Sequence, residues 1–579
     1  PWVAAVELPN IINSWFAARG WQVRAHQLAM LDAAAKGRHA LLTAPTGAGK
    51  TLAGFLPTLA DLATNPAEGL HTLYISPLKA LAVDVRRNLL KPIEEMDLDI
   101  RVETRTGDTP SDRKARQRAK PPHILLTTPE SLSLLLSYPD SFQMFAGLKR
   151  IVIDEIHAFA TTKRGDLLNL SLSRLQAIAP QMRRAALSAT VADPDEYRAW
   201  LAPSGGEVRL VLGDPGAPPD LAILLPEDRV PWAGHSGAYA TPQVMAEIET
   251  HQTTIVFCNT RGLCELIFQE LWNANELKLP IGIHHGSLDI EARRKVENAM
   301  AQGQLRALVA TASLDLGVDW GNVDCVIQMG APKGSSRLLQ RIGRANHRLD
   351  EPSEAILVPG NRFEYLEALA AYDAIQEGVL DGEPFRAGGL DVLAQHIMAC
   401  ACADAFDEAQ LLAEIRSAHQ YADLTPETFA RLLDFIATGG YALRAYDRFR
   451  RLTKGKDGLW RVTHPQFIAQ HRLNAGIIVD TPMLDVRFKN GRRLGQLDEY
   501  FAASLMPGDT FAFSGMSLEV ERTDGTDLIV RATTKKARIP SYMGARMPLT
   551  THLAGRVRQF LHDRPSWARF PADVREWLE

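Results

Sequence analysis

Two short stretches of the sequence have the residue types and spacing that bind and cleave phosphoryl groups. The first, residues 44–51, reads APTGAGKT and follows an apolar, strand-like run at 39–43. Small residues allow backbone N–H groups to close around phosphates at a helix N-terminus, while a lysine adds charge and a hydroxyl ligates Mg²⁺. Such loops open with glycine, and this one opens with Ala44, so a chance glycine-rich turn is the alternative. The positions predicted to bind nucleotide are Thr46, Gly47, Ala48, Gly49, Lys50 and Thr51, with Thr51 also a metal ligand.

The second stretch is an apolar run followed by two acids. Residues 151–153 read IVI, which is typical of a strand buried on both faces of a parallel sheet. Asp154 and Glu155 follow at its carboxyl end, where such sheets place ligands. We expect Asp154 to hold Mg²⁺ through water and Glu155 to orient or deprotonate the attacking water. An exposed acidic turn is the alternative. Both stretches together predict ATP and Mg²⁺ as cofactors, with Lys50, Asp154 and Glu155 as catalytic residues.

The elements that must position these residues are strands that alternate with helices. Apolar runs separated by helical patterns indicate an α/β fold with parallel sheets and crossover helices. Two such sets occur, one before residue 215 and one after 240, separated by a stretch rich in proline and glycine. Residues 386–470 follow with three helical patterns and a basic hairpin around KGKDG, which predicts a winged helix. Short strands and turns from residue 471 predict a small β-barrel-like module.

Composition excludes several classes of protein. A chain of 579 residues is too long for one core, and 46% hydrophobic with 23% charged residues is ordinary for globular proteins. The net charge of −4 argues against a globally basic nucleic-acid coat but not against a local basic groove. No apolar run reaches the ~18 residues of a membrane span, and the N-terminus lacks the layout of a secretory signal. Five cysteines without CxxC pairs indicate reduced thiols and a cytoplasmic protein.

With these sites in place, a family resemblance can be recognised. Asp154, Glu155, Ile156 and His157 form a DExH box, and the other motifs of superfamily 2 helicases occur around it in the expected order. Each motif alone is weak, but eleven in order are not plausibly chance. Besides the phosphate loop and the DExH box, the motifs are residues 21–27, 76–81, 105–109, 127–132, 188–190, 256–261, 284–288, 310–320 and 340–348.

The resemblance implies how the nucleotide is bound. In the motif at 21–27, it implies that Gln27 bonds the adenine edge, that Arg24 assists, and that Trp21 stacks on the base. In the motif at 310–320, it implies that Gly317 and Asp319 belong to the ATP site.

The motif at 340–348, QRIGRANHR, carries three arginines. The resemblance implies that Arg341 and Arg344 reach the γ-phosphate of ATP, where an arginine stabilises charge on the transferring group. Gln340 is expected to position the attacking water. For Arg348, a contact to the nucleic-acid strand and a surface salt bridge both stay open.

The resemblance also implies contacts to a nucleic-acid strand. Hydroxyl groups and a few lysines suit a phosphate backbone that is held without reading bases; each such residue could instead be a helix cap or a turn residue. Tyr542 stands where related proteins place a tryptophan that stacks on the strand, and packing within its own barrel is its alternative. The basic run at 111–120 is interpreted as a solvated helix surface, with nucleic-acid contact as the second interpretation. The predicted strand-binding residues are Lys79, Thr128, Thr260, Thr311 and Tyr542.

The order of modules resembles the large helicase-related (Lhr) family, and residues 340–364 and 540–549 look closest to its ligase-associated DEXH-box branch. The resemblance implies a monomeric, ATP-dependent translocase that moves 3′-to-5′ on single-stranded DNA. Such an enzyme separates DNA duplexes or RNA–DNA hybrids in DNA repair, with a DNA ligase and an associated nuclease as partners. An RNA-directed helicase and an ATP-gated nucleic-acid clamp without processive movement are the alternatives.

The helical pattern that starts at residue 547 stops midway at the end of the sequence, so we expect the protein to continue further. The expected domains are 1–215 and 216–385 (two RecA-like motor domains), 386–470 (winged helix), 471–546 (β-barrel-like) and 547–579 (start of a further helical region).

Overall fold

The computed structural model describes residues 8–189, 191–225, 230–232, 234, 236–315, 323–345, 352–476, 482–542 and 548–579. Within these ranges, the side chains of residues 79–81, 83, 84, 87 and 447 are outside the description. The chain forms two compact units. Unit 1 comprises Pro1–Ala44, Ala48–Asp214 and Glu383–Ile478, and unit 2 comprises Pro45–Gly47, Pro215–Gly382 and Val479–Glu579.

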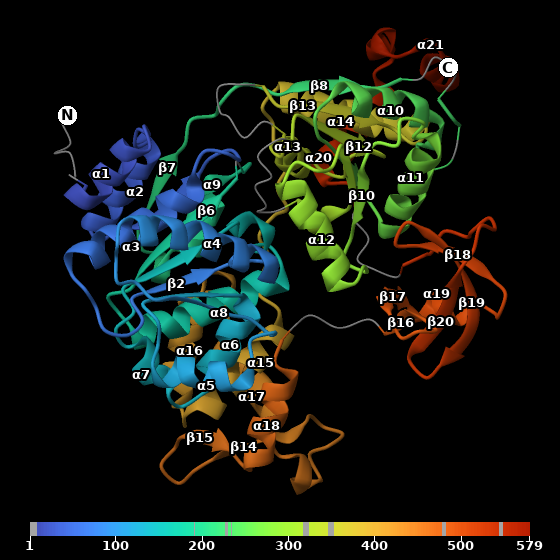
Figure 1. The fold of residues 1–579 in the computed structure, drawn as a ribbon. Helices are drawn as coiled ribbons and strands as arrows, with labels where there is room; N and C mark the ends of the chain where they lie inside the picture. Colours follow the sequence, from blue (N-terminus) through green and yellow to red (C-terminus); the bar gives the residue numbers. More distant parts are fainter. Residues whose placement is uncertain are drawn as a thin grey trace. The chain divides into compact units, whose positions relative to one another are not determined.

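Unit 1 contains a parallel sheet in the order β3-β4-β2-β5-β6-β1-β7, flanked by helices (Figure 1). The continuous apolar runs become central strands because both faces of the sheet are covered; residues 151–153 are fully buried. The strands are β1 (His39–Thr43), β2 (Thr72–Ile75), β3 (Val102–Arg105), β4 (Ile124–Thr127), β5 (Arg150–Ile153), β6 (Arg183–Ser188) and β7 (Val208–Leu212). The helices are α1 (Asn10–Ala18), α2 (Ala25–Ala35), α3 (Lys50–Thr64), α4 (Lys79–Glu95), α5 (Ser111–Ala119), α6 (Pro129–Leu136), α7 (Ser141–Phe145), α8 (Lys163–Ile178) and α9 (Pro194–Leu201).

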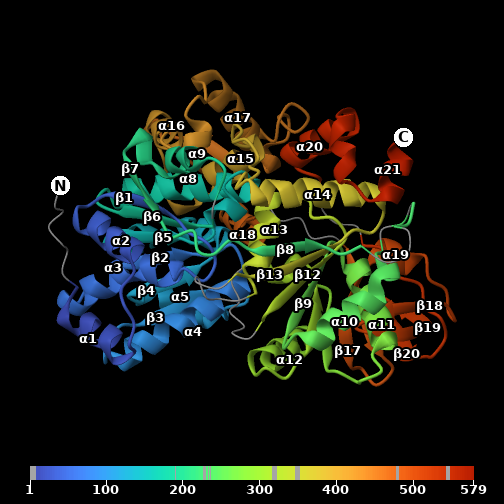
Figure 2. The same ribbon diagram turned by 90° about the horizontal axis from the view of Figure 1, so that it is seen from above.

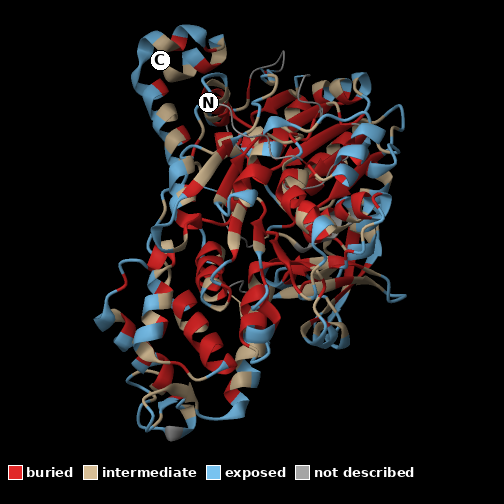
Figure 3. Cartoon of the chain, turned by 90° about the vertical axis from the view of Figure 1, so that its left-hand side faces the viewer, coloured by how far each residue is buried: buried red, intermediate tan, exposed pale blue. Residues whose placement is uncertain are grey.

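Unit 2 contains a second parallel sheet, in the order β10-β11-β9-β12-β13-β8. In the chain as a whole, buried residues gather on the strands, and exposed residues lie mainly on loops and parts of the helices (Figure 3). The two parallel sheets confirm the predicted α/β fold class. The strands are β8 (Asp220–Ile223), β9 (Thr254–Cys258), β10 (Ile281–His284), β11 (Ala307–Ala310), β12 (Cys325–Met329) and β13 (Glu354–Val358). The helices are α10 (Thr241–Thr250), α11 (Arg261–Ala274), α12 (Ile290–Ala301), α13 (Ser335–Ile342) and α14 (Arg362–Gln376).

A winged-helix region shares a core with the sheet domain of unit 1. Its helices pack on α8, and Leu167 and Leu170 of α8 belong to the same apolar cluster as Val392 and Phe429. The predicted hairpin is confirmed, because β14 and β15 pair antiparallel on either side of the KGKDG turn. The elements are α15 (Leu390–Ala403), α16 (Glu408–Arg416), α17 (Pro426–Thr438), β14 (Leu452–Lys454), β15 (Trp460–Val462) and α18 (Pro465–Asn474).

A five-stranded sheet, ordered β17-β16-β20-β19-β18, forms the β module within unit 2. It meets the motor sheet domain through backbone hydrogen bonds: Gln496 N donates to Ser287 O at 2.8 Å, and Asp289 N donates to Leu494 O at 3.0 Å. Buried Glu265 accepts from Ser514 N on the β18–β19 turn at 2.6 Å. The elements are β16 (Met483–Phe488), β17 (Arg493–Asp498), α19 (Glu499–Ala503), β18 (Thr510–Phe513), β19 (Met516–Asp524) and β20 (Asp527–Ala532).

The C-terminal helices α20 (Thr551–His562) and α21 (Ala572–Leu578) complete the core of the second motor sheet. Helix α20 lies beside α14 in both views (Figures 1 and 2). Leu553, Phe560 and Val574 are buried in the same cluster as Leu357 of β13. The helical region predicted after residue 547 therefore belongs to the packing of the second motor domain.

The five cysteines are buried free thiols. Among the described residues, none of the helices combines the length and apolar character needed to cross a membrane.

We predict that Gly495→Ala loosens the β module from the motor sheet domain. Gly495 has φ +149°, and an added Cβ would lie 2.1 Å from the backbone O of Ser287, so the backbone must shift. We expect a loss of roughly 3 kcal/mol, measured as a fall in the thermal unfolding midpoint. The matched control is Gly525→Ala, which has φ +59° but open space around the new Cβ and should cost only about 1 kcal/mol. Equal shifts for both variants would contradict the argument.

Candidate ATP site and the motif network of the second motor domain

The phosphate loop lies between β1 and α3 and has the backbone that its glycines allow. Gly47 and Gly49 have φ of 79° and 75°, a region that side-chain-bearing residues rarely adopt. Ala44 is not among the described residues with positive φ. Its backbone conformation therefore does not require the glycine that other phosphate loops have at this position. Lys50 Nζ donates to Ala44 O at 2.8 Å. The lysine side chain is thus held within the loop that is predicted to bind the phosphates of the nucleotide.

Gln27, one of the predicted adenine-binding residues, packs directly against this loop. Gln27 is buried; its Oε1 accepts from Arg24 N at 3.0 Å, and its Nε2 lies 3.5 Å from Gly49 O. His26 Nε2 donates to Ala48 O at 2.9 Å, and burial lowers the pKa of His26. His26 was not predicted from the sequence, although its neighbour Gln27 belongs to the predicted segment 21–27.

Trp21 remains half exposed, at 50%. The Arg19 guanidinium lies 4.8 Å from its ring centroid, and Trp15 meets it edge-on. An exposed ring of this kind can stack on a base, so the predicted adenine contact of Trp21 stays a prediction.

The DExH box holds a buried carboxylate at the end of β5. Asp154 is 4% exposed; Tyr74 Oη donates to its Oδ2, and Glu155 N donates to its Oδ1 at 3.0 Å. Burial, with the negative charge of Glu155 beside it, raises the pKa of Asp154. Glu155 has φ +48°. This backbone conformation is uncommon for a glutamate, and it occurs more often at functional sites than elsewhere. The contact of Tyr74 was not predicted, because a tyrosine inside an apolar strand is typical of a core residue.

His157 connects the DExH box with the motif at 188–190. Its Nδ1 lies 3.0 Å from Ser188 Oγ and 3.6 Å from Glu155 Oε2. Burial lowers the pKa of His157, which favours a neutral imidazole. Thr190, the last residue of that motif, lies outside the described residues.

The loops predicted to hold a strand in unit 1 are tied together by Arg164. It donates to Pro77 O at 2.8 Å and to Glu130 Oε1 at 2.6 Å, which joins the motifs at 76–81 and 127–132. Thr128 caps α6, accepting from Ser131 N at 3.4 Å, as in the helix-cap alternative. The side chain of Lys79 lies outside the description.

The basic run at 111–120 forms α5, and much of its charge is paired. Arg113 and Arg116 contact Glu103 at 3.2 and 3.0 Å, and Arg118 contacts Asp140 at 2.9 Å. The pairing agrees with the interpretation as a helix surface.

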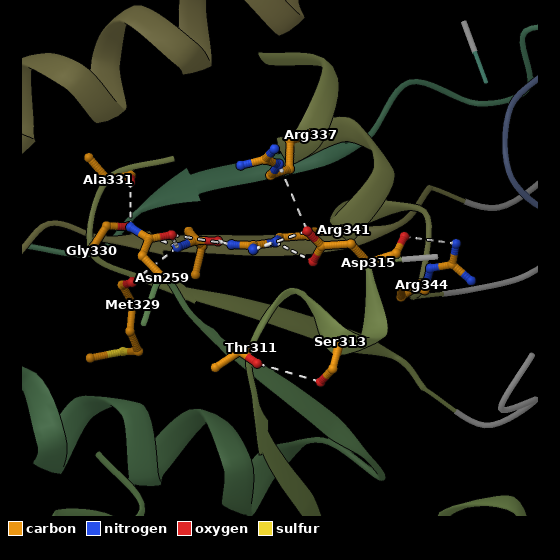
Figure 4. Close-up of polar contacts among 11 residues, drawn as sticks. Asn259, Thr311, Ser313, Asp315, Met329, Gly330, Ala331, Arg337, Arg341 and Arg344 are labelled. Atoms are coloured by element: carbon orange, nitrogen blue, oxygen red, sulfur yellow. Dashed lines mark hydrogen bonds and ion pairs between the residues drawn. The ribbon is translucent and has the colours of Figure 1, made fainter. Parts of the chain in front are cut away.

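In unit 2, a buried polar network joins the motifs at 256–261, 310–320 and 340–348 (Figure 4). Arg341 is 1% exposed. Its Nε and Nη2 donate to the two carboxylate oxygens of Asp315 at 2.8 and 3.2 Å, and its Nη1 donates to Gln328 Oε1 at 2.5 Å. Gln328 in turn donates to Asn259 Oδ1 at 3.2 Å, and Asn259 Nδ2 donates to Ala331 O at 2.8 Å.

The contacts of Arg341 and Arg344 to the γ-phosphate stay a prediction. All three guanidinium nitrogens of Arg341 bond inside the motif network, and its guanidinium lies 4.9 Å from the Phe257 ring. Arg344 Nη2 donates to the backbone O of Asp315 at 3.2 Å. The two arginines therefore have different surroundings in the described structure.

The remaining predicted residues of unit 2 have more ordinary contacts. Thr260 caps α11, accepting from Leu263 N at 3.1 Å. Thr311 Oγ1 lies 3.5 Å from Ser313 Oγ. Tyr542 is partly buried against the core of the β module, with the Arg261 guanidinium 5.5 Å from its ring. Predicted residues outside the description are Gly317, Asp319 and Arg348.

Comparisons with known proteins agree with this architecture. Residues 24–197 match the DEAD/DEAH box helicase family, 240–348 the helicase conserved C-terminal domain, and 373–540 the winged helix domain of large helicase-related proteins. The chain is 34% identical to the ATP-dependent helicase Lhr-Core of Methanocaldococcus jannaschii, over 96% of this chain and 67% of that protein. The chain belongs to the Lhr helicase family.

Two further Lhr proteins show the extent of the likeness. The Lhr helicase/uracil glycosylase of Escherichia coli is 32% identical over 99% of this chain but only 42% of its own length. The structure of Mycobacterium smegmatis helicase Lhr bound to ssDNA and AMP-PNP matches with a TM-score of 0.77 and 30% identity, over 99% of this chain and 73% of that one. As a member of the Lhr family, the chain is an ATP-hydrolysing helicase; the ligase-associated branch stays a prediction.

We predict that the buried ion pair of Arg341 contributes much more to stability than an exposed ion pair of the same unit. Arg341→Ala leaves the buried Asp315 carboxylate without its main partner and should cost roughly 3–5 kcal/mol. The control is Arg522→Ala, which removes an exposed ion pair with Asp524 and should cost about 1 kcal/mol or less. Thermal unfolding of the two variants against wild type measures the difference. Equal losses for the two variants would show that the network does not depend on Arg341.

Proposed function

We propose that this Lhr helicase moves 3′-to-5′ along single-stranded DNA and separates DNA duplexes or RNA–DNA hybrids in DNA repair. The observation that carries the proposal is the likeness, over 99% of the chain, to an Lhr helicase bound to ssDNA and AMP-PNP. A DNA ligase and an associated nuclease are proposed partners of a monomer, on family resemblance alone.

The residues of the phosphate loop and the DExH box suit Mg²⁺ and ATP. The Thr51 hydroxyl and the Asp154 carboxylate are the hard oxygen donors that Mg²⁺ prefers, and the raised pKa of buried Asp154 reflects a carboxylate that a cation would stabilise. Mg²⁺ neutralises charge on the phosphates when it is bound. Lys50 and the loop amides hold the phosphates, and Gln27 with Arg24 and Trp21 binds the adenine.

Hydrolysis then requires a base and a group that stabilises the transferring phosphoryl. Glu155 orients the attacking water and takes its proton, with Gln340 as a second contact to that water. Arg344 stabilises the γ-phosphoryl, together with nucleotide contacts from Gly317 and Asp319. Arg341 is a second proposed contact to the γ-phosphoryl group, which its guanidinium would make by exchanging hydrogen bonds of the motif network.

A strand would be held by groups that contact phosphate rather than base edges. Thr128, Thr260 and Thr311 lie at loops that follow β4, β9 and β11, and they are proposed strand contacts with Lys79. Tyr542 is proposed to stack on a base after Arg261 moves from its ring. Contacts of this kind do not distinguish sequences, which suits a motor.

We predict that Glu155→Gln lowers kcat for ATP at least about 100-fold, because an amide cannot accept the proton. ATP affinity should change less than about threefold, as measured by equilibrium binding of a fluorescent ATP analogue. Glu68→Gln, at an exposed glutamate of the same unit, is the control and should leave both quantities unchanged. Turnover that survives in Glu155→Gln would remove Glu155 from the role of general base.

We predict that the chain moves 3′-to-5′ along a single strand and moves faster on DNA than on RNA. On single strands of one sequence, made as DNA or RNA and blocked with streptavidin, the chain should displace streptavidin from the 5′ end of DNA. It should act more slowly at the 3′ end and on RNA. Faster displacement on RNA would favour the RNA-directed helicase, and ATP hydrolysis without displacement from either end would favour the clamp.

A further inference from the structure

Asp381 lies outside every helicase motif, yet it caps the helix that carries Gln340 and Arg341. Its Oδ2 accepts from Ser335 N at 2.8 Å and its Oδ1 accepts from Ser336 N at 2.9 Å. Ser336 Oγ donates to the backbone O of Asp381 at 2.7 Å, and Asp381 N donates to Ser335 Oγ at 3.1 Å. The first N–H groups of α13, which have no partner within the helix, are thus satisfied by a residue 45 positions further along.

The residue before α13 leaves room for this carboxylate. Gly334 is the N-cap and has φ −172°, so its backbone conformation does not require glycine. A Cβ at this position would lie 2.7 Å from Asp381 Oδ2 and 3.1 Å from Thr550 Cγ2. A side chain at Gly334 would therefore disturb the Asp381 contact by occupying its space, and not by straining the backbone.

Thr550 joins the C-terminal segment to the same carboxylate. Its Oγ1 donates to Asp381 Oδ2 at 2.8 Å, and its N donates to Lys333 O at 3.0 Å. Thr550 directly precedes α20, whose Leu553 is fully buried in the core of the second motor domain. The start of α13 and the start of α20 are therefore fixed to one side chain.

The carboxylate is held in its charged form. Burial by itself would raise its pKa, but hydrogen bonds from Ser336, Thr550 and Ser335 hold the pKa of Asp381 below its ordinary value. A negative charge at a helix N-terminus is stabilised by the helix dipole. At the other end of α13, Asp315 holds Arg341, so each end of this short helix is fixed by an aspartate.

We propose that Asp381 is a positioning residue for ATP hydrolysis: with Thr550, it sets the place of α13 and therefore of Arg344, which follows the helix. The C-terminal segment 548–579 then takes part in hydrolysis through Thr550 without contacting the nucleotide. This inference rests on the proposed role of Arg344.

The main variant is Asp381→Asn, which keeps the size of the side chain but places an N–H₂ group against one of the two serine amides. We expect kcat to fall roughly 10-fold, because small displacements of a catalytic group are costly, with KM for ATP within about twofold. The matched control is Asp324→Asn. Asp324 also accepts two backbone N–H groups, from Gln252 at 2.8 Å and Thr253 at 2.9 Å, but at the amino end of β12. Its variant should lower the unfolding midpoint similarly and leave kcat unchanged.

A double-mutant cycle separates positioning from general destabilisation. In an Arg344→Ala background, Asp381→Asn should cause no further loss of kcat. An additive loss, or an unchanged kcat in Asp381→Asn while Arg344→Ala is impaired, would overturn the positioning role alone. An unimpaired Arg344→Ala would instead overturn the proposed role of Arg344.

The C-terminal part of the proposal has its own pair of variants. Thr550→Val keeps the shape of the side chain and removes the hydroxyl, and we expect kcat to fall about threefold. Thr551→Val, at the exposed next residue, should match wild type. An unchanged kcat in Thr550→Val would remove the C-terminal segment from the mechanism.

Discussion

The buried ion pair between Arg341 and Asp315 is the interaction on which the second motor domain depends. A buried charge is tolerated only when it is paired and its remaining donors are satisfied, and Arg341 satisfies its donors with Asp315, Gln328 and Asn259. These partners come from loops or strands far apart in sequence, so the pair forms only when several motifs are in place together. The geometry of each motif in this network therefore depends on the others.

The accessory regions are extensions of the motor cores rather than separate attachments. The winged helix shares an apolar cluster with α8 and adds the ion pair between Arg174 and Glu414 at 2.9 Å. The β module is joined to the second motor domain by backbone hydrogen bonds and by Glu265, which is fully buried beside His285. Within each unit, the accessory region therefore moves with its motor sheet when that sheet moves.

Local patterns predicted much of the fold and are the basis of the candidate ATP site. The continuous apolar runs at β5, β9 and β12 and the turn between β14 and β15 are short-range signals, and all formed as expected. The candidate site was predicted from residues that are adjacent in sequence, as in Lys50 with Thr51 and Asp154 with Glu155. Other contacts carry no such signal. Tyr74 reaches Asp154 across neighbouring strands, Gln328 pairs with Asn259 across 69 residues, and Asp381 caps α13 from 46 residues away. These pairs form only in the tertiary structure, which the local pattern of apolar and polar residues does not predict.

The alternation of the chain between the units has a consequence for its covalent continuity. Outside the phosphate loop, the chain passes from unit 1 to unit 2 after Asp214, returns after Gly382 and leaves again after Ile478. A single break at any of these points yields two fragments, and each fragment still shares a buried core with the other. A break after Asp214, for example, separates Leu167 and Leu170 from the winged-helix residues that they pack against. The nicked protein would thus hold together as a noncovalent complex, and its two fragments could be separated only by unfolding a core that they share.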